Sequence, residues 1–167
     1  MGSLLLAVAM LDACASGPGE TRSYTDPFAY CASVGTVDAP DARYTGPPVP
    51  TAVAEGLRRA FGAPPTAPAD AFTRGTTWRC MDGKVYACTV GANLPCDARA
   101  DTSRTPSAAI AEYCRANADA ASVPAYVTGR STVYEWRCAG GAPVIGRQFV
   151  QPDARGFLSN IWHEIPR

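Results

Sequence analysis

The chain has 167 residues, 47% of them apolar, and its 15 basic residues balance its 15 acidic ones. This length predicts one domain with a modest hydrophobic core. The balanced charge, with arginines spread along the chain, argues against nucleic acid or an anionic membrane surface as the main partner.

The N-terminal segment predicts export. Residues 4–10 form an apolar run that is short for a signal sequence and far too short to span a bilayer. Residues 11–14 resemble the lipobox of bacterial lipoproteins, in which the cysteine, here Cys14, is acylated and becomes the first residue of the mature chain. The alternative is ordinary signal-peptidase cleavage at Ala-Cys-Ala, residues 13–15.

Both alternatives predict the same domain order and an exported protein. A signal segment or lipobox at 1–14 precedes a flexible tether at 15–25 and a single folded domain at 26–167. We expect the protein either on the outer membrane, facing the periplasm through a lipid anchor, or soluble in the periplasm or medium.

Six cysteines remain when Cys14 is set aside, and three disulfides require such an even number. A zinc site is the structural alternative, but the sequence has no Cys-x-x-Cys pair and its one histidine is His163. We expect neither a metal nor another cofactor. The six are Cys31, Cys80, Cys88, Cys96, Cys114 and Cys138.

The first part of the folded domain predicts two helices separated by loops. Asp26 and Pro27 suit the N-cap and first position of a short helix that ends near a glycine. Residues 37–50 are rich in Pro, Gly and Asp and predict a loop. Residues 51–61 repeat an apolar residue every four positions, which indicates a surface helix, and the prolines of 63–70 predict another loop.

Residues 76–89 predict a β-hairpin, because the Asp82-Gly83 pair between alternating strand-forming residues favours a two-residue turn. This turn places Cys80 opposite Val85 and fixes the two faces of the hairpin. The face expected to point to the core carries Trp78, Cys80, Val85 and Ala87, and the face expected to point outward carries Arg79, Met81, Lys84, Tyr86 and Cys88.

The C-terminal part predicts a helix at 106–118 and a strand at 123–128. A second hairpin is expected around Gly140-Gly141, followed by a last strand at 157–165 that completes a three-stranded antiparallel meander. The predicted fold class is therefore α+β, with short helices linked by disulfides to antiparallel hairpins.

A weak repeat relates the two hairpins. Trp-Arg-Cys occurs at 78–80 and at 136–138, and Tyr-Cys occurs near the end of each preceding helix, at 30–31 and 113–114. We interpret this as an internal duplication with half-repeats at about 26–96 and 105–150. The duplication predicts that the helix cysteine bonds the hairpin cysteine in each half, which gives the pairs Cys31–Cys80, Cys114–Cys138 and, by remainder, Cys88–Cys96.

No residues stand at catalytic spacing. His163 precedes Glu164 but lacks the second histidine of a zinc-protease motif, and Asp82 has a structural role in its turn. Trp78 and Trp136 are expected in the core. The candidates for binding a partner are the predicted outward residues, with cross-strand packing of the arginines as the alternative. These candidates are Arg79, Lys84, Tyr86 and Arg137.

The segments at 78–96 and 127–138 resemble a family of small exported proteins of Gram-negative bacteria for which no activity is known, over about residues 30–165. That resemblance implies secretion and a disulfide-stabilised fold. The lipobox and hairpin are more loosely similar to the lipoprotein inhibitors of c-type lysozyme. We therefore expect a cell-envelope binding or structural module whose partner is another envelope or extracellular protein. The alternatives are an inhibitor of a wall-degrading enzyme and a hydrolase with an unrecognised site.

Overall fold

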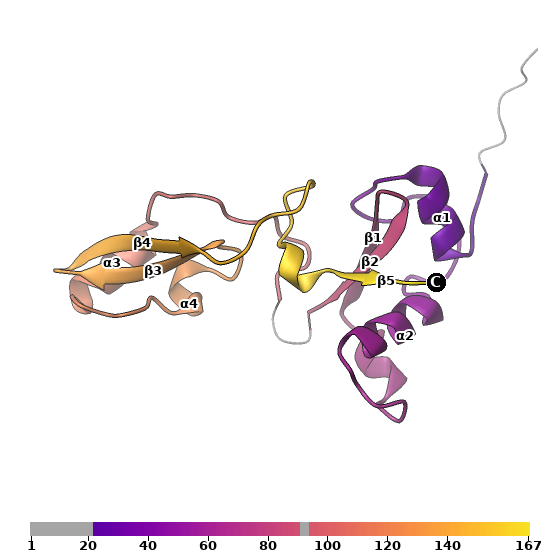
Figure 1. Ribbon diagram of the computed structural model, residues 1–167, viewed down its shortest axis with the longest axis horizontal. Coiled ribbons are helices and arrows are strands. Elements are labelled where there is room, and N and C mark those ends of the chain that lie inside the picture. The colour runs from indigo at the N-terminus through magenta and orange to yellow at the C-terminus, as the bar shows by residue number, and fades with distance from the viewer. Residues whose placement is uncertain (1–21, 91–93) are drawn as a thin grey trace, which may run out of the picture.

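The computed structural model describes residues 22–90 and 94–167, so the predicted signal segment with Cys14 lies outside the described residues. The chain has the predicted α+β fold of short helices and antiparallel strands (Figure 1). The helices are α1 (Pro27–Val34), α2 (Thr51–Ala60), α3 (Ala108–Ala116) and α4 (Ala125–Thr128), with 3-10 helices η1 (Ala69–Phe72) and η2 (Ser159–Ile161). The strands are β1 (Thr76–Met81), β2 (Lys84–Thr89), β3 (Tyr134–Ala139), β4 (Ala142–Gln148) and β5 (His163–Ile165).

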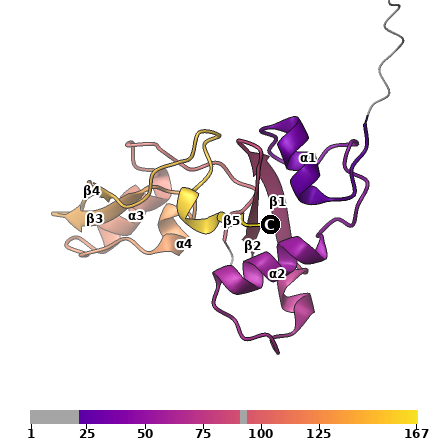
Figure 2. The same cartoon turned by 45° about the vertical axis from the view of Figure 1, so that its right-hand side comes forward.

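The elements form two lobes along the long axis of the molecule (Figure 1). The first lobe holds α1, α2 and the sheet β1-β2-β5, and the second holds α3, α4 and the hairpin β3-β4. Figure 2 shows α1 and α2 on the same side of the first sheet. The buried apolar side chains form two clusters, one centred on Trp78 beneath these helices and one running from the second lobe to Trp162.

Side-chain caps decide where two of the helices begin. The Asp26 carboxylate accepts the N–H of Ala29 at 2.8 Å, so α1 begins at Pro27 as predicted. The Ser107 hydroxyl accepts the N–H of Ile110 at 3.2 Å, and α3 therefore begins two residues later than the predicted start at 106.

The first hairpin has the predicted turn and register. Asp82 and Gly83 both have positive φ, at 52° and 78°, as a type I′ turn requires. Cys80 lies opposite Val85, which confirms the alternation of the two faces. Trp78 is 1% exposed and its indole N–H donates to the carbonyl of Pro48 at 2.8 Å, so the core assignment of this residue is confirmed.

The prediction of a C-terminal meander is wrong. The hairpin β3-β4 stands alone, and β5 crosses back to the first lobe, where it pairs antiparallel with β2. Ile165 is 2% exposed and lies directly against Gly56 of α2, so the last strand packs against this helix. The predicted strand at 123–128 is also wrong, because this segment turns into the short helix α4 directly after Pro124.

Two helix–hairpin units, α1 with β1-β2 and α3 with β3-β4, share a set of backbone contacts. The turn glycine of each hairpin donates its N–H to the residue four positions after the helix cysteine. The hairpin cysteine donates its N–H to the residue six positions after the helix cysteine. The bonds are Gly83 to Gly35 (2.9 Å) and Cys80 to Val37 (3.0 Å) in the first unit, and Gly141 to Ala118 (3.0 Å) and Cys138 to Ala120 (2.8 Å) in the second.

The three disulfides join the pairs expected from the sequence. Cys31–Cys80 and Cys114–Cys138 link helix to hairpin in the two units, with Cα–Cα distances of 5.1 and 5.2 Å. Cys88–Cys96 ties the end of β2 to the connection between the lobes, with a Cα–Cα distance of 5.8 Å. All six cysteines are buried, so the three disulfides lie in the core and are not exposed to solvent.

Candidate functional site

The predicted partner-binding residue Arg79 is buried, and its assignment to an exposed surface is wrong. Its side chain is 0% exposed and forms an ion pair with Asp153. The guanidinium carbon lies 4.4 Å from the centre of the Phe157 ring and 4.3 Å from that of Trp162. The segment between β4 and β5 therefore covers the face of the first hairpin that was expected to point outward, and it holds Arg79 by one carboxylate and two aromatic rings.

Asp153 organises this covering segment. One of its carboxylate oxygens accepts the N–H groups of Arg155 at 2.8 Å and Phe157 at 3.1 Å, and the other accepts from Arg79. Burial alone would raise the pKa of Asp153, but these hydrogen bonds and the charge of Arg79 lower the pKa below its ordinary value. Asp153 is therefore ionised at neutral pH, and it holds the segment between β4 and β5 against Arg79 of the first hairpin.

A second carboxylate fixes the same turn from the first lobe. Asp38 accepts from Arg155 at 2.8 Å and from Arg99 at 2.7 Å. The hydrogen bond from Arg155, followed by that from Arg99, lowers the pKa of Asp38 against the opposing effect of burial. These ion pairs are partly exposed, so each one contributes little stability alone.

Lys84 and Tyr86, the next two predicted binding residues, meet at Glu164 of β5. The lysine ammonium and the tyrosine hydroxyl both donate to one oxygen of this carboxylate, at 3.0 and 3.2 Å. Burial and the carboxylate raise the pKa of Tyr86, and the same carboxylate raises the pKa of Lys84. Lys84 stays exposed, so this cluster is a charged edge of the sheet whose cation is already paired.

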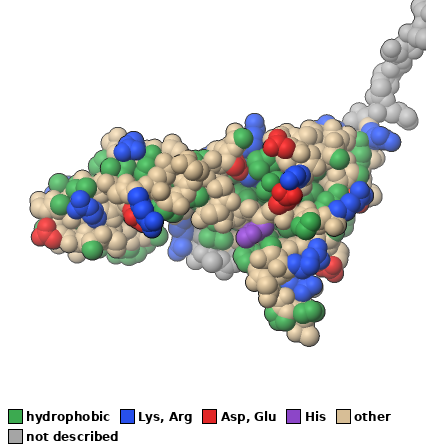
Figure 3. All heavy atoms as spheres, viewed as in Figure 1, with side chains coloured by type: hydrophobic (Ala, Val, Ile, Leu, Met, Phe, Trp, Pro, Cys, Tyr) green, Lys and Arg blue, Asp and Glu red, His purple; other side chains and the backbone are tan. Residues whose placement is uncertain are grey.

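Arg137, the last predicted binding residue, is exposed on β3 in the second lobe. Its side chain forms no hydrogen bond or ion pair with the rest of the described chain. The four candidates are therefore not brought together, because one is buried, two share a carboxylate and Arg137 lies in the other lobe. Figure 3 likewise shows basic and acidic side chains interspersed over one face of the molecule.

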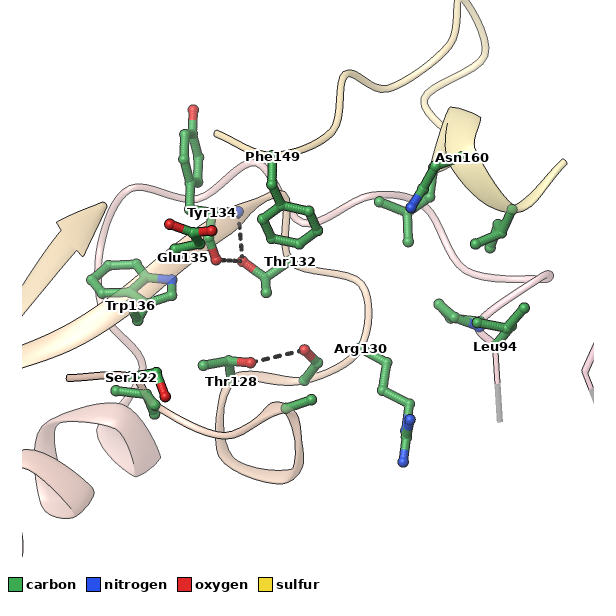
Figure 4. Close-up of a pocket in the computed structure, with 16 residues that line it drawn as sticks. Leu94, Ser122, Thr128, Arg130, Thr132, Tyr134, Glu135, Trp136, Phe149 and Asn160 are labelled. Carbon is green, nitrogen blue, oxygen red and sulfur yellow. Dashed lines mark hydrogen bonds between the residues drawn. The ribbon is translucent and has the colours of Figure 1, made fainter. Parts of the chain in front are cut away.

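A cavity of about 320 Å³ opens between α4, β3 and η2. Figure 4 shows Trp136 and Ser122 on one side and Leu94 and Asn160 on the other, with Phe149 and Thr132 between them. The base is apolar, with Trp136 only 5% exposed, whereas Phe149 at the edge is 49% exposed. The lining residues that complete the wall include Val123, Leu158 and Ile161.

Several polar groups of this cavity are hydrogen-bonded within the chain, and others, such as those of Ser122 and Asn160, line it as well. The Thr128 hydroxyl donates to the carbonyl of Gly129 at 3.0 Å, and the Thr132 hydroxyl contacts the backbone of Tyr134 (Figure 4). Glu135 pairs with Arg147 at 2.8 Å. The apolar part of the lining suits the binding of a small apolar group, such as one side chain of a partner.

His163 and the other metal-binding residue types have structural surroundings. His163 stacks edge-on against the ring of Phe61, at 4.8 Å between centres, so aromatic packing accounts for its position. Within residues 22–90 and 94–167 there is no group of three side chains that could hold a metal ion. In the same residues no helix has the length and apolar character needed to cross a membrane.

The cavity could not be predicted from the sequence, because its walls come from separate segments between residues 94 and 161 that share no motif. Comparison with protein-family models, with curated proteins and with solved structures finds no match to this chain.

Proposed function

We propose that this protein is an exported binding module of the cell envelope, and that it recognises another envelope or extracellular protein. The observation that carries the proposal is the state of the six folded cysteines, which are all buried and all joined in disulfides. Such bonds form and persist in oxidising compartments and are rare in the cytosol. Export through the N-terminal segment would supply that environment.

A binding role is supported by two features of the second lobe. It carries an apolar cavity with an exposed aromatic edge, and it leaves Arg137 exposed without an ionic partner in the described chain. The cavity offers an apolar contact, and Arg137, on the opposite face of β3 from Trp136, offers a separate charge contact. Apolar anchors and arginines are both common in protein-binding surfaces.

Cell fractionation of the full chain in a Gram-negative host tests the export proposal. The wild-type protein should appear in the envelope or periplasm, and thiol alkylation without reductant should leave the six folded cysteines unmodified. Cys14→Ser should move the protein from the membrane to the soluble fraction if Cys14 carries the lipid. A cytoplasmic protein with alkylated cysteines would refute export.

Crosslinking in intact cells tests the binding role. Photo-crosslinkers placed at Phe149, at the edge of the cavity, and at Tyr126, which is 81% exposed on α4, allow the two surfaces to be compared. A protein captured from Phe149 and competed by purified wild-type chain supports the module, and a wall-degrading enzyme among the captured proteins would favour the inhibitor alternative. Equal capture from any exposed position would contradict a defined binding surface.

A further inference from the structure

Arg79 and Arg137 occupy the same place in the two helix–hairpin units. Each precedes the hairpin cysteine by one residue, and its carbonyl oxygen lies beside the sulfur of the helix cysteine, at 4.0 Å in the first unit and 3.9 Å in the second. Each also points to the face of the hairpin that lies away from the helix, as the alternation of buried and exposed residues along β3 shows for Arg137. The two arginines are therefore structural equivalents.

The first unit shows what this position accepts. Residues 150–162 cross the hairpin and present Asp153, Phe157 and Trp162 to Arg79. The carboxylate pairs with the guanidinium while the two rings lie against it. Arginine suits such a site because its planar, weakly hydrated cation can stack on rings and donate hydrogen bonds at once.

The second unit has the equivalent arginine, Arg137, but no segment of the described chain covers it as residues 150–162 cover Arg79. Arg137 is exposed, and opposite it on β4 lies Val144, which is half-buried. Of the neighbours on this face, Ala139 and Gly146 are small, and Glu135 is already paired with Arg147 at 2.8 Å. Between residues 104 and 149 five arginines stand against three acidic residues, so this lobe carries a net positive charge.

We propose that the Arg137 face of β3-β4 binds a segment of a partner protein that presents a carboxylate flanked by aromatic side chains. The occupant follows from the chain itself, since residues 150–162 supply that combination to the equivalent arginine, and from the excess positive charge of the second lobe. This inference rests on the proposed function and adds the chemistry of the partner.

The probe is a synthetic peptide with the sequence of residues 150–162, titrated into the folded full-length protein and followed by NMR. The peptide should bind in the millimolar range, which is the affinity expected for a short unordered segment, and should shift the signals of Val144 and its neighbours. Replacing Asp153 of the peptide by Asn should weaken binding about tenfold, the amount expected for one hydrogen-bonded charge pair.

Substitutions in the protein assign the site. Arg137→Gln should weaken binding about tenfold, and Arg137→Lys should recover part of the affinity, since lysine restores the charge but not the planar stacking. The control is Arg115→Gln, which removes the same charge from the exposed surface of α3 and should leave binding unchanged. Arg137 is exposed, so these variants are expected to fold as the wild type does.

Three outcomes overturn the proposal. The first is the absence of peptide binding in the millimolar range. The second is an equal loss of affinity in Arg137→Gln and Arg115→Gln. The third is unchanged affinity in Arg137→Gln, which would indicate that the peptide replaces residues 150–162 of the protein at Arg79. These measurements use purified protein and need no export. A failure here is therefore separate from a failure of the fractionation experiment.

Discussion

Asp153→Asn is expected to destabilise the fold by about 3 kcal/mol, because it leaves a buried guanidinium without its carboxylate. The side chains of Arg79 and Asp153 are 0% and 7% exposed, so water cannot replace the lost charge. The asparagine oxygen can still accept the N–H groups of Arg155 and Phe157, and the turn survives. Asp153→Ala removes these two bonds as well, at about 1 kcal/mol each, for a total of about 5 kcal/mol.

Denaturant unfolding with the disulfides intact measures these differences. The matched control is Glu135→Gln, which removes a carboxylate from an ion pair whose side chains are 49% and 77% exposed and should cost less than about 1 kcal/mol. Adding Arg79→Met to Asp153→Asn should recover most of the loss, because methionine can pack between the two rings. Equal effects of Asp153→Asn and Glu135→Gln would refute the assignment of a buried, coupled pair.

The same pair gives the stability a pH dependence of known sign. The pKa of Asp153 is lowered in the folded protein from its ordinary value of 3.8. A group with a lowered pKa stabilises the fold above its unfolded pKa and loses this contribution as the pH falls through the folded pKa. The difference in unfolding free energy between wild type and Asp153→Asn should therefore be constant near neutral pH and shrink below about pH 3.8.

Three further substitutions test the packing and the surface cluster. Gly56→Ala would stabilise an unhindered helix, but here its Cβ would overlap the Ile165 side chain, so unfolding experiments should show a loss of about 1–3 kcal/mol. Ser107→Ala removes the cap of α3 and should cost about 1 kcal/mol, which Ser107→Asp should largely avoid. Glu164→Gln should lower the pKa of Tyr86 towards its ordinary value, as NMR with labelled tyrosine rings would show, and an unchanged pKa would mean that burial alone raises it.

Local signals are sufficient to predict the two hairpins. Asp82-Gly83 and Gly140-Gly141 supply residues that tolerate positive φ, and a two-residue turn then sets the register without help from the rest of the chain. The disulfide pairs could also be predicted from local signals, because the Tyr-Cys and Trp-Arg-Cys segments occur in both halves of the chain and suggest the same pairing in each half. The segment at 123–128 has strand-forming residues, yet the fixed φ of Pro124 and the surrounding packing favour a helical turn.

Contacts between segments that are distant in the sequence could not be predicted. The identical Trp-Arg-Cys context surrounds Arg79 and Arg137, yet one is buried and the other exposed. The difference lies in residues 150–162, which fold over one hairpin and not the other, and no local sequence pattern predicts this. The pairing of β5 with β2 is likewise a long-range feature, and it is accompanied by the contact of Ile165 with Gly56 of α2.

The pairing of β5 with β2 has a consequence for the order of events during synthesis. Residues 163–165 supply the third strand of a sheet whose other strands lie between residues 76 and 89. The sheet of the first lobe is therefore completed only after the second lobe has been synthesised. Until then the open edge of β2 and the apolar side of α2 are exposed to other chains, which is the hazard that unpaired strand edges carry. The first sheet therefore keeps an unpaired edge along β2 until residues 163–165 have been made and have paired with it.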